Sequence, residues 1–242
     1  WSRDTRNDFF VPVVGSTQSV SAEIALPGST VEYYKVSFDF AKYWPLNPAL
    51  VLRTGLNFGY GDSYGKDFVR NLCYTAPTLP TTGNPNPPPP PAPTVPCLST
   101  SPDYDKTVTA TGLPFFENFY AGGIAAQGKV RGFVDNTLGP AYTSPLGYRQ
   151  PLGGSFLLAG SVEAIFPKLF DSPAARISAF LDFGNVYDGW DNFSASELRA
   201  STGVALQWRS PMGPLSISYA FPLRKKDYDQ IERLQFTFGG QL

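Results

Sequence analysis

The segment GVALQWRSPMGPLSISYAF, residues 203–221, contains two runs in which apolar side chains alternate with small or polar ones. A period of two places successive side chains on opposite faces of a β-strand. Between the two runs, the Pro- and Gly-rich residues 211–214 favour a tight turn. The segment therefore predicts an antiparallel β-hairpin with one apolar face and one face of small and polar residues.

The same alternation continues along the chain on both sides of this hairpin. It predicts eight strands, at about residues 17–27, 32–44, 49–62, 154–167, 174–187, 201–210, 214–222 and 231–242. Residues 1–5 are expected to be the stub of a ninth strand. Helical periodicity is weak throughout, so we expect an all-β, antiparallel fold.

The connections between these strands differ greatly in length. Those at residues 45–48 and 211–214 are short, whereas those at 187–198, 222–232 and above all 63–153 are long. Short turns on one rim and long loops on the other are typical of a transmembrane β-barrel of the outer membrane. We therefore predict that 63–153 is a long extracellular loop. Its Pro-rich insert, residues 75–97, includes a Pro run at 87–91 that is expected to act as a stiff spacer rather than as a ligand for a partner.

Composition separates a membrane barrel from a soluble β-sandwich binding module, which is the alternative with the same strand pattern. Only 16% of residues are charged, against about 25% in a typical soluble domain. The polar faces of the strands carry mostly Ser, Gly, Ala, Thr, Gln and Asn, and the apolar faces are rich in aromatic residues. This pattern favours lipid outside and a hydrated lumen inside. The net charge of −1 offers no electrostatic case for nucleic acid.

Sites for covalent chemistry have little support in the sequence. The chain has no His, which excludes Ser-His-Asp and Cys-His triads and argues against most zinc sites. The Gly-rich residues 59–65 lack the Lys of a phosphate-binding loop and are better explained as a strand end facing a crowded lumen. The scattered acidic residues leave a glycosidase pair open but unsupported. We expect a protein that is not an enzyme and that has no metal and no cofactor.

The two cysteines, Cys73 and Cys97, bracket the Pro-rich insert. In an oxidising compartment such a pair is expected to form a disulfide, and two free thiols in a loop are the alternative. A titration that finds two thiols under native, non-reducing conditions would refute the disulfide.

An Arg in the longest connection has candidate partners on two predicted strands. The motif VRGF consists of Val130, Arg131, Gly132 and Phe133, and both Glu163 and Asp182 occupy the polar register of neighbouring strands. A carboxylate in a barrel lumen favours a cationic partner, and Arg can pair with carboxylates through two hydrogen bonds. We therefore predict that the loop folds inward and that Arg131 contacts these acids. A solvated Arg in an outward loop is the alternative.

Several further motifs occur in an order that matches a known family. They are FFENFYAGG (115–123), VRGF (130–133), NTLGP (136–140), VEAIFP (162–167), LDFG (181–184), GVALQWRSPMGPL (203–215) and QFTFG (235–239). Together they resemble the C-terminal half of the barrel in the bacterial outer-membrane assembly and secretion superfamily. The resemblance covers almost the whole chain except about residues 66–110. The Cys pair and the Pro-rich insert precede the VRGF motif, depart from the family pattern and look lineage-specific.

The resemblance implies a barrel of about sixteen strands, preceded by periplasmic domains. It implies that the VRGF loop folds into the lumen, with its Arg paired to acids that match Glu163 and Asp182. It also implies that the first and last strands meet at a weak seam. The last strand corresponds to residues 231–242, and its seam residues are Leu234, Phe236, Phe238, Gly240 and Leu242.

The function implied by the resemblance is the assembly, folding and insertion of β-barrel proteins into the bacterial outer membrane, by templating of client strands at the seam. The expected partners are the lipid bilayer, nascent barrel proteins and accessory lipoproteins that bind the periplasmic domains. A protein-secretion pore of the same superfamily and a passive small barrel are the alternatives.

Eight strands leave two open edges, which cannot face lipid. The chain is therefore expected to be half of a larger barrel or to self-associate with a second copy. A closed eight-stranded barrel is disfavoured, because its lumen is too narrow for the folded-in loop.

Overall fold

The computed structural model describes residues 1–9, 11–29, 31–64, 68–71, 107–110, 113–143, 149–167 and 174–239. The chain forms two compact units, Trp1–Ser63 with Gly112–Leu242, and Tyr64–Thr111. The smaller unit contains an antiparallel pair of short strands, β5 (Phe68–Asn71) and β6 (Thr107–Ala110). Cys73, Cys97 and the Pro-rich insert lie outside the described residues, so the disulfide stays a prediction.

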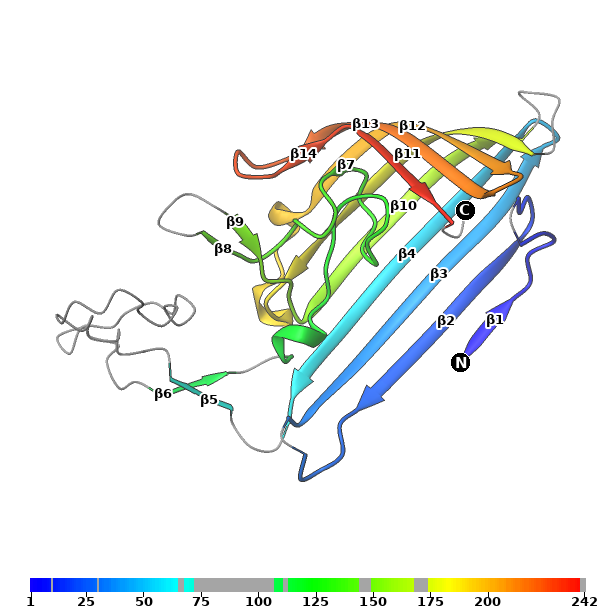
Figure 1. Ribbon diagram of the computed structural model, residues 1–242. Helices are drawn as coiled ribbons and strands as arrows, with labels where there is room; N and C mark the ends of the chain where they lie inside the picture. Colours follow the sequence, from blue (N-terminus) through cyan, green and yellow to red (C-terminus); the bar gives the residue numbers. More distant parts are fainter. Residues whose placement is uncertain are drawn as a thin grey trace, which may run out of the picture. The chain divides into compact units, whose positions relative to one another are not determined.

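A nine-stranded antiparallel sheet forms the larger unit, in the order β1-β2-β3-β4-β10-β11-β12-β13-β15 (Figure 1). The strands are β1 (Ser2–Asp4), β2 (Gly15–Ile24), β3 (Tyr33–Asn47), β4 (Leu50–Ser63), β10 (Phe156–Phe166), β11 (Ala175–Tyr187), β12 (Arg199–Ser210), β13 (Gly213–Arg224) and β15 (Leu234–Phe238). Each strand pairs with the next one along the chain, with two exceptions. β4 pairs with β10 across the long connection, and β13 pairs with β15 rather than with β14. The all-β, antiparallel fold predicted from the sequence is confirmed.

The sheet is curved and open (Figure 1). Among the described residues, β1 pairs only with β2, and β15 pairs only with β13, so these two strands are the edges. An open sheet of this kind agrees with part of a larger barrel and not with a closed small one. Helical structure in the described residues is limited to three short 3-10 turns, η1 (Phe115–Glu117), η2 (Trp190–Asn192) and η3 (Ala195–Glu197). None of the helices in the described part of the chain is long and apolar enough to cross a membrane.

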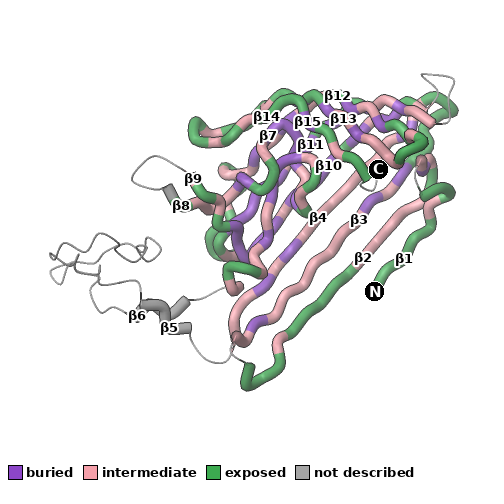
Figure 2. Tube along the Cα trace, in the orientation of Figure 1, coloured by how far each residue is buried: buried purple, intermediate pink, exposed green. Residues whose placement is uncertain are grey.

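The two faces of the sheet differ in chemistry as the alternation predicts. The convex face exposes large apolar side chains on successive strands, among them Val162, Leu181, Val204, Trp208, Tyr219, Phe221, Leu234 and Phe236. The concave face carries small and polar residues, such as Ser178, Ala205, Ser216 and Ser218, which are buried. Burial is concentrated on β10 to β13, whereas β1 and the end of β2 are exposed (Figure 2).

The connection over residues 113–143 packs against the concave face and accounts for this burial. Its apolar side chains form a core with residues of β10 and β11, made of Phe119, Ala121, Val130, Phe133, Leu138, Leu157, Ala159 and Val186. Gly59 on β4 is needed for this packing, because a Cβ there would lie 2.5 Å from the ring of Phe119. The Gly-rich strand end therefore admits the loop. A further hairpin, β8 (Ala141–Thr143) with β9 (Arg149–Pro151), follows it.

The last strand differs from the single strand expected over residues 231–242. Residues Ile231–Glu232 form a separate strand, β14, which pairs with β7 (Gly132–Phe133) of the loop and not with β13. The strand rejoins the sheet only as β15, at Leu234. The reason is that the loop offers backbone partners on the concave side, which draw Ile231 and Glu232 off the sheet. Gly240 and Leu242 lie outside the described residues.

Candidate functional site

The residues around Arg131 form a compact irregular structure on the concave face. Short bridges join Phe119 to Gly154, Ala121 to Leu138 and Gly123 to Val130. They bring Arg131 to the centre of the wall formed by β10 and β11. At the next position, Gly132 has a φ of +91°, a conformation that L-residues with a Cβ rarely adopt. The turn at Gly132 thus lets the Arg131 side chain face the sheet.

Arg131 is held by both acids that the sequence singled out. Its Nε donates to Asp182 Oδ2 at 2.7 Å and its Nη2 to Asp182 Oδ1 at 2.8 Å, which is a bidentate pair. Its Nη1 donates to Glu163 Oε1 at 3.0 Å, and its backbone N–H also donates to Asp182 Oδ2, at 3.1 Å. The predicted contact of Arg131 with these carboxylates is therefore present in the structure.

Further side chains of the wall orient the two carboxylates. Ser161 Oγ donates to Asp182 Oδ1 at 2.7 Å, and Ser178 Oγ donates to Glu163 Oε1 at 2.8 Å. Arg53 Nη1 on β4 lies 3.7 Å from Glu163 Oε2. Arg131 makes the direct ion pair with Asp182, whereas Glu163 also has Arg53 close by. Lys129 acts electrostatically on both carboxylates.

The ring of Phe180 closes the site from the side of β11. The guanidinium carbon of Arg131 lies 3.4 Å from the centre of this ring, so the cation is stacked on an aromatic face as well as hydrogen-bonded. Only 1% of Arg131 and 0% of Asp182 are exposed to solvent. Burial works against the charge, but the carboxylates of Asp182 and Glu163 outweigh it and raise the pKa of Arg131. The group is thus a permanently charged anchor that holds the loop.

The rest of the predicted motif has a packing role. Val130 and Phe133 are fully buried in the loop core, on either side of Arg131 and Gly132. A Cβ on Gly132 would lie 2.9 Å from the Cβ of Ala220 on β13. All four residues of the motif therefore contact the wall or the loop core.

The seam residues are placed as a strand at an open edge. Leu234, Phe236 and Phe238 share the convex face, and 73% of Phe236 is exposed. The residue between the first two, Gln235, points to the concave side and is buried against the VRGF motif. Gln235 is the first residue of the QFTFG motif and lies on the polar register of the last strand, but no role was predicted for it.

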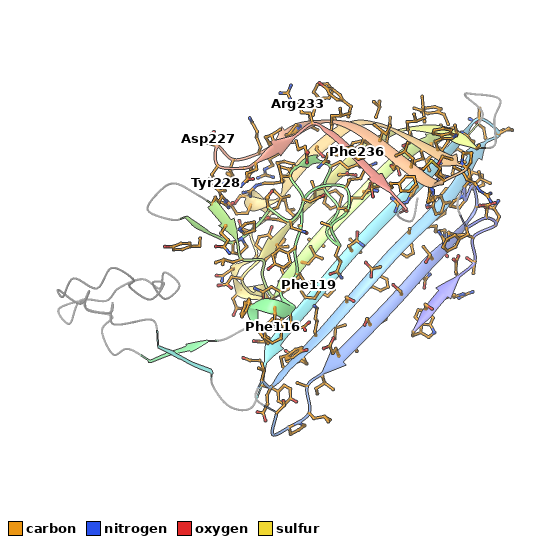
Figure 3. All side chains as sticks on the ribbon, viewed as in Figure 1. Phe116, Phe119, Asp227, Tyr228, Arg233 and Phe236 are labelled. Carbon is orange, nitrogen blue, oxygen red and sulfur yellow. The ribbon has the colours of Figure 1, made fainter. Side chains whose placement is uncertain are left out.

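A second polar cluster lies where β12 begins and was also missed. Arg199 donates from Nε to Asp229 Oδ2 at 2.8 Å and from Nη2 to Asp229 Oδ1 at 3.1 Å. Lys226 Nζ donates to Glu197 Oε1 at 2.7 Å. Asp229 and Lys226 belong to the connection between β13 and β14, which also carries Tyr228 (Figure 3). The cluster therefore ties two neighbouring connections together.

A metal centre is not formed by the described part of the chain. There, no group of three or more His, Cys, Asp or Glu side chains could hold a metal ion. The contacts of Arg131 fix the loop on the concave face of the sheet. The loop in turn holds the start of the last strand. These features define part of an outer-membrane barrel with a loop anchored in its lumen.

Comparison with known proteins identifies the family. The model of the Omp85 superfamily domain matches residues 1–242, and the chain belongs to the Omp85 superfamily. Membership places it in the bacterial outer membrane.

Two relatives are named outer membrane protein assembly factor BamA. The one from Neisseria meningitidis serogroup B is 31% identical over 265 residues, covering 99% of this chain and 28% of the relative. The one from Nitratidesulfovibrio vulgaris is 35% identical over 135 residues, covering 52% and 16%. The chain thus spans less than a third of the length of these relatives.

A solved structure supports the same relationship. The crystal structure of BamA from Haemophilus ducreyi lacking POTRA domains 1-3 matches with a TM-score of 0.69 and 28% identity. The match covers 98% of this chain and 40% of that one. The resemblance read from the motifs is therefore confirmed at the level of sequence and of fold.

Proposed function

We propose that this chain belongs to a protein that folds and inserts β-barrel proteins into the bacterial outer membrane. The similarity to two relatives named as assembly factors supports this function within the superfamily. The observation that carries the proposal is the edge at β15. This strand has five residues, against twelve in its neighbour β13, and only five residue pairs join the two strands.

The mechanism we propose is strand templating at this edge. Unpaired backbone N–H and C=O groups in lipid each cost several kcal/mol, so an edge strand in a membrane favours pairing with another strand. A client strand that pairs with β15 satisfies its own backbone and that of the edge. No covalent bond is made or broken, so the activity is not enzymatic.

Arg131 has the role of an anchor in this mechanism. Its ion pairs fix the loop to β10 and β11, and β7 of the loop then pairs with β14 next to the edge. The loop thus supports the short edge strand from the concave side. A supported edge can present its backbone to a client without collapsing into the lumen.

The proposed partners follow from this role. They are the lipid bilayer, which contacts the apolar convex face, and nascent barrel proteins, which pair with the edge. Accessory assembly lipoproteins would bind periplasmic domains of the whole protein. Self-association through the open edges is a further proposal, since two such sheets could satisfy each other's edges.

A reconstituted assembly assay tests the function. The full-length protein is placed in liposomes, an unfolded client barrel is added, and folding is followed by protease resistance of the client. Assembly of β-barrels predicts folded client in the bilayer at a rate well above that of empty liposomes. A secretion pore would instead deliver its substrate, unfolded or soluble, to the far side of the membrane, and that result would contradict the proposal.

A further inference from the structure

The loop segment 130–134 is bonded on two sides. On one side, Arg131 is held by the acids of β10 and β11. On the other side, the backbone of the next residues pairs with the start of the last strand, with Phe133 opposite Ile231 and Gly132 opposite Glu232. Val134 N–H also donates to the carbonyl of Gln230, at 3.0 Å. The segment therefore connects β10 and β11, which are paired with strands on both sides, to the last strand at the open edge.

The side chain of Gln235 extends this connection into β15. Its Oε1 accepts from the N–H of Gly132 at 3.0 Å, and its Nε2 donates to the carbonyl of Phe133 at 2.7 Å. The carboxamide thus offers one acceptor and one donor to the loop backbone, as a peptide group of a neighbouring strand would. Only 2% of Gln235 is exposed, so solvent cannot replace these bonds without movement of the loop or of the strand.

The bend in the last strand explains why a side chain is needed. β14 leaves the sheet to pair with β7. β15 rejoins β13 after Arg233, whose carbonyl accepts from Ala220 N–H at 2.9 Å. From Leu234 onward the backbone of the strand is engaged with β13. Its N–H and C=O groups then lie in the plane of the sheet and do not point to the loop on the concave face. Gln235 is the first residue after the bend whose side chain points to the concave face, and it replaces that pairing.

We propose that Gln235 is a positioning residue, which latches the edge strand β15 to the loop anchored by Arg131. The latch makes the loop and the edge strand one cooperative unit: either both are held, or both are released. This inference rests on the proposed function for its biological meaning, since a client can pair fully with β15 only when the strand is positioned. The coupling itself is a property of the molecule and can be measured without any client.

Hydrogen–deuterium exchange of the full-length protein in lipid nanodiscs tests the latch. Two variants remove one end of the connection each, Gln235→Met, which keeps the side-chain length, and Arg131→Met. The control is Thr237→Val, on the same strand and the same face. Gln235→Met removes two hydrogen bonds of ordinary strength to the loop, which is expected to raise exchange about tenfold. Arg131→Met removes more bonds and a charge, so its effect is expected to be larger.

The expected result is reciprocal. Gln235→Met raises exchange in residues 130–134 as well as in the last strand, and Arg131→Met raises it in 231–238 as well as in the loop. Thr237→Val leaves the loop unchanged. If either variant affects only its own segment, the latch is refuted.

A second measurement covers the case in which a variant does not fold. In the unchanged protein, exchange in 130–134 and in 231–238 should depend on denaturant with one common slope, because the two segments open together. Two distinct slopes would refute the latch. Failure of the assembly assay would refute the proposed function and leave these exchange data unaffected, so the two claims fail separately.

Discussion

Replacing Arg131 with Met is expected to destabilise this fold strongly. Met keeps much of the length of the side chain and fills the space on the ring of Phe180. It removes the charge and all the hydrogen bonds that the guanidinium donates to Asp182, Glu163 and Ser161. The change therefore isolates the electrostatic role of Arg131 from its packing.

The expected loss of stability depends on the two buried carboxylates that remain in the variant. Asp182 is fully buried and keeps the hydroxyl of Ser161 but loses its bidentate ion pair, so that Lys129 is the cation still acting on it. Glu163 keeps Arg53 at 3.7 Å and the hydroxyl of Ser178. Removal of one partner from a buried ion pair typically costs roughly 3–5 kcal/mol, because the remaining charge is uncompensated. We expect a loss in this range, dominated by Asp182.

Equilibrium unfolding in urea, with the full-length protein in lipid vesicles and Trp fluorescence as the signal, measures this loss. The informative control also neutralises the acids, with Glu163→Gln and Asp182→Asn in the Arg131→Met background. Because the buried charges are then gone, the combined variant should recover more than half of the lost stability. If Arg131→Met alone costs less than about 1 kcal/mol, the value of an ordinary exposed pair, the loop is not anchored as described.

Two further predictions concern the loop turn and the polar cluster at the start of β12. Gly132→Ala should lower the free energy of unfolding by about 1–3 kcal/mol, since it places a Cβ at positive φ and against Ala220, whereas Gly189→Ala, with open space around its Cβ, should be close to neutral in the same urea titration. The hydrogen bond from Lys226 lowers the pKa of Glu197, so this group stabilises the fold above its ordinary pKa and loses that contribution as the pH falls through the lowered value. Glu197→Gln should therefore weaken the acid dependence of unfolding, and an unchanged pH profile would contradict the assignment.

Much of the fold could be predicted from local sequence, because one side of a barrel strand faces the lipid of the membrane. The period of two is then imposed on each strand independently, so that residues such as Val204 and Trp208 reveal their face without knowledge of their neighbours. The same parity placed Glu163 and Asp182 on the lumen side. A buried acid in that position favours a cation, which is why the contact of Arg131 could be predicted from sequence.

The bend of the last strand could not be predicted in this way. The alternation of Leu234 and Phe236 does not extend back past Arg233, since Ile231 lies on the parity of Gln235. The break limits β15 but does not say what Ile231 and Glu232 pair with. The separation arises from pairing between β7 and β14, and the contact of Gly132 with Gln235 spans 103 residues of sequence. The cluster of Arg199 and Asp229 was missed for a related reason. Asp229 lies in a connection, where the parity of strands carries no information.

Photo-crosslinking at the edge strand tests the templating account most directly. A photoreactive amino acid replaces Phe236 on β15 of the full-length protein, or Val204 on β12 as a control, since both side chains are exposed on the convex face. The protein is irradiated in liposomes while a client barrel is stalled during assembly. Templating at β15 predicts crosslinks to a terminal strand of the client from position 236 and few from position 204. Equal yields at the two positions, or none at 236 while the client still folds, would contradict it.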